Sequence, residues 1–153
     1  MTAVMEETRQ ARAVMDRVEA VEEVALSFPE QDERRSKLLA AVRSDLAGAR
    51  PLRPRIAAEL LGLSEKTVRA WAAEGVLLVA SGSSPRILLD VARVHEVLHL
   101  VRELRAAGQT RGLLDEVHRR LVDATWLERR DLAQSLEQMR RGEGIVRVAG
   151  PSA

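Results

Sequence analysis

The chain has 153 residues, no cysteine, only 2% aromatic residues and a formal net charge of +1, with 24 basic and 23 acidic side chains. The lack of cysteine excludes disulfides, thiolate metal sites and thiol redox chemistry. The near-neutral charge gives no bulk argument for a nucleic-acid partner, so a basic surface would need charges segregated by face. The acidic start from Met1 to Glu7 is unlike a signal peptide and no apolar run could span a bilayer, so we expect a cytoplasmic protein without membrane contact.

Residues 1–50 are expected to form an N-terminal helical arm. Helical spacing places five apolar side chains of the first helix on one stripe, namely Val14, Val18, Val21, Ala25 and Phe28. Pro29 ends that helix, and Gly48 is the expected stop of a second helix over residues 32–46. An uncovered apolar stripe on such an arm predicts dimerisation or partner binding.

Residues 51–108 are predicted to contain two short helices joined by a tight turn. Ala57 and Ala58 are small enough for a close helix crossing, and Gly62 suits a turn that needs a positive φ. Ser64 is expected to cap the second helix through its hydroxyl. The side chains expected to fill the angle between the two helices are Leu61, Leu63, Val68 and Trp71.

The stretch Leu63-Ser-Glu-Lys-Thr-Val-Arg-Ala-Trp71, followed by Gly75-Val-Leu77, resembles the helix-turn-helix of MerR-like and excisionase-like DNA-binding modules. The resemblance covers about residues 55–108. It implies a mainly α, winged helix-turn-helix fold, with a recognition helix over residues 64–74 and a short β-hairpin wing over residues 77–89, flanked by N- and C-terminal helices. Asp90 is expected to cap the helix that follows the wing.

The same resemblance implies a surface for double-stranded DNA on the recognition helix, the wing and the start of the preceding helix. Lys66 and Arg69 would reach base edges or phosphates, whereas the Glu65 carboxylate would repel phosphate or accept a hydrogen bond from a cytosine amino group. The complete set of predicted DNA-binding residues is Arg55, Ser64, Glu65, Lys66, Thr67, Arg69, Ala70, Ser83, Ser84 and Arg86.

The segment His95-Glu-Val-Leu-His99 has the letters of a zinc-peptidase motif and places two imidazoles on one edge of a helix. A third ligand would have to come from elsewhere, and Glu116 and His118 lie downstream. The same helix carries a continuous apolar stripe with the two histidines at its flank. We therefore interpret both histidines as boundary residues, and the sequence predicts no metal, no cofactor, no catalytic residue and no enzymatic activity.

Residues 109–153 are expected to form a C-terminal helical region and a tail, with Trp126 as a core anchor. The tail from Leu132 to Arg147 resembles those with which bacterial antitoxins wrap their toxins, and the Arg- and Ala-rich chain resembles an actinobacterial antitoxin-type regulator.

The sequence as a whole favours a sequence-specific transcriptional regulator that binds DNA as a homodimer and represses its own operon. One alternative is an antitoxin that neutralises a cognate toxin through its terminal helices while it binds its operator. A further alternative is an excisionase-like architectural DNA-binding protein.

Overall fold

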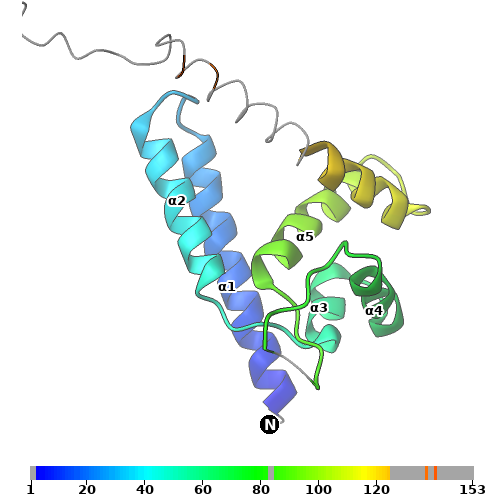
Figure 1. Cartoon of the computed structure of the whole chain (residues 1–153). Helices are drawn as coiled ribbons and strands as arrows, with labels where there is room; N and C mark the ends of the chain where they lie inside the picture. Colours follow the sequence, from blue (N-terminus) through cyan, green and yellow to red (C-terminus); the bar gives the residue numbers. More distant parts are fainter. Residues whose placement is uncertain (1–2, 83–84, 125–136, 138–139, 141–153) are drawn as a thin grey trace, which may run out of the picture. The chain divides into compact units, whose positions relative to one another are not determined.

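The computed structural model describes residues 3–82, 85–124, 137 and 140. In chain order its helices are α1 (Ala3–Leu26), α2 (Glu33–Ala47), α3 (Pro54–Leu61), α4 (Glu65–Ala73) and α5 (Val91–Ala106), and residues 113–124 are also helical (Figure 1). The chain divides into two compact units, Met1–Leu114 and Asp115–Ala153, and α1 to α5 all belong to the first. None of the described helices combines the length and the apolarity that crossing a bilayer requires.

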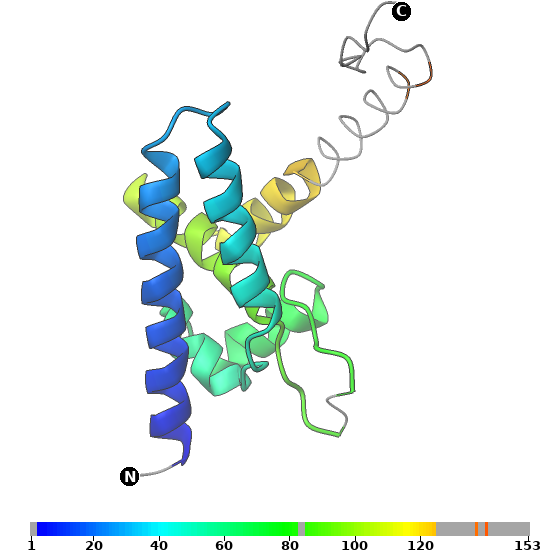
Figure 2. The same ribbon diagram turned by 90° about the vertical axis from the view of Figure 1, so that its left-hand side faces the viewer.

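The helices α1 and α2 form an antiparallel hairpin (Figures 1 and 2). At its turn the guanidinium of Arg34 lies over the Phe28 ring, 4.4 Å from the ring centroid. Asp32 caps α2 by accepting a hydrogen bond from the backbone N–H of Arg34. Hydrogen bonds from the Arg34 guanidinium, and then from its backbone N–H, lower the pKa of Asp32 to about 2. Gly48 ends α2, as the sequence predicted.

The core of the first unit is built around α5. This helix buries seven of its side chains, more than any other helix in the described part of the chain: Val91, Val94, His95, Val97, Leu98, Val101 and Leu104. Asp90 caps α5 by accepting from the backbone N–H of Arg93, which confirms the predicted start. On α1, Val18 and Ala25 of the predicted stripe are buried, so the chain itself covers part of the face that was expected to meet a partner.

The helices α3 and α4 form the predicted pair with a three-residue turn. Gly62 ends α3 with φ 65° and ψ 37°, in the left-handed region that favours glycine. Ser64 caps α4, its hydroxyl accepting from the backbone N–H of Thr67 at 3.1 Å. Val68 and Trp71 are buried, whereas Leu63 is half-buried. The small residues Ala57 and Ala58 are buried where α3 packs in the core.

Arg105 near the end of α5 holds the C-terminus of α3. Its Nη1 donates to the carbonyl of Leu61 at 2.9 Å and its Nη2 donates to the carbonyl of Gly62 at 3.0 Å. These carbonyls have no partner within their own helix, and a cation is favourable at the negative end of the helix dipole. The long helix α5 therefore fixes the end of α3 from which the turn departs.

The β-hairpin wing predicted over residues 77–89 is not formed, so the expectation of a winged helix-turn-helix is wrong. The described residues contain no strand, and Leu89 makes only isolated bridges, one to Leu52 and one to Val79. Among the described residues, no ladder of successive bridges develops between the two arms. Backbone hydrogen bonds from Ala80 to Leu88 and from Asp90 to Leu78 join the two arms, and Leu77 and Leu89 are buried. Val79 and Ile87, nearer the turn, are exposed, and a two-stranded hairpin without a buried apolar face is marginal in water.

Several predicted features lie outside the described residues. They are Ser83 and Ser84 of the predicted DNA-binding set, Trp126 as a core anchor, and the antitoxin-like tail from Leu132 to Arg147.

Candidate nucleic-acid interface

One side of α4 faces solvent. Val68 and Trp71 anchor the helix in the core, and the residues between them point outward because side chains three and four apart share a helix face. Thr67 is half-buried. The exposed members of the predicted DNA-binding set at and around this helix are Ser64, Glu65, Lys66, Arg69 and Ala70.

An open cleft, which we call the arginine cleft, lies beside the start of α4. Residues from α1, from the stretch 50–55, from α4 and from the stretch 85–88 line it. Its charged lining residues are five arginines and two glutamates: Glu7, Arg50, Arg53, Arg55, Glu65, Arg69 and Arg86. A chain of net charge +1 therefore concentrates positive charge in one hollow.

The arginine cleft brings together four residues of the predicted set, Arg55, Glu65, Arg69 and Arg86, although they come from three separate segments of the chain. Ser64, Lys66, Thr67 and Ala70 do not line the cleft and lie at or on α4 outside it.

The cations of the arginine cleft fall into two groups. Arg69 pairs with Glu65 one turn earlier on α4 at 3.1 Å, and Arg53 pairs with Glu7 of α1 at 3.0 Å. By contrast, Arg50, Arg55 and Arg86 form no ion pair with any residue that the structure describes. These three guanidinium groups are the ones that an anion can approach without displacing a carboxylate.

Two lining residues, Arg50 and Arg53, were absent from the predicted set. They join the cleft because Leu52 and Leu89 exchange backbone hydrogen bonds of 2.9 and 2.7 Å, which hold the stretch 50–55 beside the segment that carries Arg86. This pairing is not visible in the sequence. The available signal was the alternation of arginine and proline before α3, since proline keeps a segment extended and its neighbours exposed.

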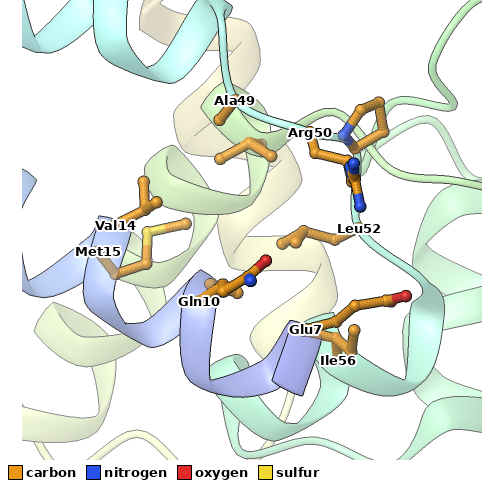
Figure 3. A pocket seen from close by; sticks show the side chains of 11 residues that line it. Glu7, Gln10, Val14, Met15, Ala49, Arg50, Leu52 and Ile56 are labelled. Carbon is orange, nitrogen blue, oxygen red and sulfur yellow. The ribbon is translucent and has the colours of Figure 1, made fainter. Parts of the chain in front are cut away.

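A smaller, largely apolar pocket of about 180 Å³ lies between α1, the stretch 49–52 and the first residues of α3 and α5 (Figure 3). Val14, Met15 and Leu52 form part of its wall, and Glu7 and Arg50 line both this pocket and the arginine cleft. Its volume is below the several hundred Å³ typical of sites for drug-sized ligands.

A polar cluster joins α1 to α5. Oε1 of Glu22 lies 2.7 Å from Nε2 of His95 and 3.2 Å from Nε2 of His99, and the two Nε2 atoms are 3.0 Å apart. The two imidazole rings meet edge to face, with an interplanar angle of 85°. In the described part of the chain this Glu22/His95/His99 cluster is the group whose donor atoms lie close enough together to hold a metal ion.

No family model, no curated protein and no solved structure matches this chain. The assignment of a function therefore depends on the geometry and charge of the sites described above.

Proposed function

We propose that the protein binds duplex DNA through α4 and the arginine cleft and acts as a transcriptional regulator. The observation that carries the proposal is the position of Arg50, Arg55 and Arg86, which have no ion pair among the described residues, in one cleft with the exposed start of α4. Clustered basic side chains that neutralise phosphates supply much of the affinity of proteins for DNA. A neighbouring exposed helix can then read base edges.

The size of α4 suits this role. An α-helix with its side chains is about 10–12 Å across, and the major groove of B-form DNA is about 12 Å wide, so the nine-residue helix α4 can enter it. Its anchoring residues Val68 and Trp71 lie on the inner face, so docking in a groove would leave the core undisturbed. Lys66 and Arg69 are the α4 side chains suited to reach guanine or phosphate oxygens.

The ion pair between Arg69 and Glu65 does not prevent such a contact. An exposed pair of this spacing is worth about 0.3–0.5 kcal/mol, whereas a bidentate contact of arginine with guanine contributes about 1–3 kcal/mol to base discrimination. The pair is therefore weak enough for a base or a phosphate to replace the carboxylate. In the free protein the pair keeps the Arg69 side chain ordered on the solvent face of α4.

The proposal is tested by fluorescence anisotropy with duplex DNA from upstream of the protein's own gene, titrated at several salt concentrations. Binding should weaken linearly with the logarithm of salt concentration. Because each neutralised phosphate adds about 0.9 to the slope, Arg50→Ala, Arg55→Ala and Arg86→Ala should each reduce the slope by about that amount. The matched control is Arg43→Ala on α2, an exposed arginine outside the cleft, which should leave the slope unchanged. Equal slopes for the cleft variants and the control would refute the proposed surface.

A further inference from the structure

We infer that Glu22, His95 and His99 form a binding site for Zn²⁺ or a similar divalent transition metal, which ties α1 to α5. The three donor atoms converge from two helices, at mutual distances of 2.7, 3.0 and 3.2 Å. In a tetrahedral zinc site with metal–ligand distances of about 2.0–2.2 Å, neighbouring donors are roughly 3.3–3.6 Å apart. The shortest contact would have to lengthen by roughly 0.6–0.9 Å, and the other two by less, to open the cluster to that size.

Hydrogen bonding alone does not account for the cluster. An imidazole Nε2 either carries a proton and donates or lacks one and accepts, and a carboxylate oxygen only accepts. Three atoms that all touch one another cannot alternate donor with acceptor around a triangle. At least one of the three contacts therefore joins two like groups, whereas a metal ion at the centre accepts a lone pair from each atom.

The donor set indicates which metal fits. Two imidazole nitrogens and one carboxylate oxygen form a ligand set found in zinc sites, and imidazole suits zinc, copper, iron and nickel. Magnesium and calcium prefer all-oxygen sites, so they fit this cluster poorly.

The three side chains of the cluster differ in how far they are buried. The side chains of His95 and Glu22 are 8% and 20% exposed, and that of His99 is 41% exposed. The inner side of the site is therefore shielded by the core, and the open side at His99 leaves room for water or another ligand to complete the coordination.

The third donor explains why the sequence favoured the opposite interpretation. The two histidines are four residues apart on α5 and were read as boundary residues, with Glu116 and His118 as the nearest candidates for a third ligand. The structure supplies Glu22 instead, from 73 residues before His95. The neighbouring pair between Glu19 of α1 and Arg102 of α5 holds the two helices together along the same line of contact.

The expected consequence of metal binding is a firmer attachment of α1 to α5. A ligand that binds only the folded state stabilises that state. This consequence concerns folding and does not depend on the proposed DNA binding, so the two proposals fail independently.

The test uses the full chain, freed of metal by chelation and dialysis and titrated with Zn²⁺ in competition with a chromophoric chelator. Wild-type protein should bind one Zn²⁺ per chain, and Glu22→Gln and His99→Gln should each weaken binding about tenfold or more. His118→Gln, which changes the one histidine of the sequence outside the cluster, is the matched control and should bind like the wild type. Zn²⁺ should raise the Tm of the wild type and of the control but not of the two cluster variants.

Two results would overturn the inference. One is the absence of saturable Zn²⁺ binding to the folded wild-type chain. The other is an unchanged affinity in Glu22→Gln, which would mean that the histidine pair alone captures the ion. Circular dichroism of each metal-free variant verifies its fold, and the visible spectrum of Co²⁺ bound to the wild type reports the coordination without any substitution. Excess Mg²⁺ should not displace the bound ion.

Discussion

Gly62 is a position where both the backbone conformation and the space around it favour glycine. Its φ of 65° is costly for any residue with a Cβ, and a Cβ built there would lie 3.0 Å from Nη1 of Arg105. Gly62→Ala should therefore lower the free energy of unfolding by about 1–2 kcal/mol, measured by urea denaturation. Gly48→Ala is the matched control, since Gly48 has a φ of −85° and its added Cβ would meet its nearest neighbour at 3.5 Å. A loss at Gly48 as large as that at Gly62 would contradict this account.

Asp32 makes the stability of the α1–α2 hairpin depend on acid. Its pKa is about 2 in the folded chain, below its ordinary value of 3.8, because Arg34 donates hydrogen bonds to the carboxylate. A carboxyl group with a lowered pKa stabilises the fold above its ordinary pKa, and that contribution disappears as the pH falls through the folded value. Wild-type stability should therefore decline between about pH 4 and pH 2, and Asp32→Asn should be less stable at pH 7 with a shallower decline. Urea denaturation across this pH range measures both, and parallel curves for the two proteins would argue against the cap.

The contact between α5 and the end of α3 depends on one side chain. Arg105 donates to two carbonyls that are otherwise free at the C-terminus of α3. Arg105→Ala should lower the free energy of unfolding by about 1–2 kcal/mol, in the range of hydrogen bonds made by charged groups, reduced by partial exposure. Arg43→Ala serves as the control in the same denaturation series, because its side chain is exposed on α2 and outside these contacts. If both variants lost the same free energy of unfolding, the hydrogen bonds from Arg105 to α3 would not contribute to stability.

Local signals predicted the helices well. Asp90 and Ser64 cap the helices that they were expected to cap, and Gly48 and Gly62 end helices where the sequence indicated. Each of these effects depends on a residue and its neighbours within one turn, which the sequence displays directly.

Features that depend on distant pairing were less accessible from sequence. The resemblance to DNA-binding modules implied a hairpin over residues 77–89, yet whether two arms form a ladder depends on what packs against them. Leu89 instead exchanges both of its backbone hydrogen bonds with Leu52, and its neighbours Leu88 and Asp90 bond to the other arm at Ala80 and Leu78. For the same reason the sequence did not indicate that Arg50 and Arg53 join the cleft or that Glu22 meets the two histidines.

For the whole chain, the net charge does not show how the charged side chains are distributed over the surface. The formal charge of +1 suggests no partner, but the arginine cleft gathers five arginines against two glutamates. Electrostatic attraction to DNA depends on such local concentrations, because exposed charges farther apart than about 8–10 Å are largely screened at physiological salt.

We expect two copies of the chain to bind one operator, because helix-turn-helix proteins commonly bind paired half-sites about 34 Å apart. Light scattering coupled to size-exclusion chromatography, performed on the complex with its upstream DNA, should give a mass of two chains per duplex. The free chain need not dimerise through the apolar stripe of α1, since Val18 and Ala25 of that stripe are already buried. A complex of one chain per duplex, stable at all protein concentrations, would rule out the paired arrangement.

The helix α3 is held near both of its ends by residues in or beside α5. Leu89, two residues before α5, is bonded to Leu52, two residues before α3, and Arg105 in the last turn of α5 donates to the carbonyls at the C-terminus of α3. Tilting α3 would break both attachments together, so α3 and the turn that leads to α4 are pre-organised. The entropic cost of ordering this region is met during folding rather than at the moment of binding. Backbone positions in α3 should therefore differ little between the free and the bound protein.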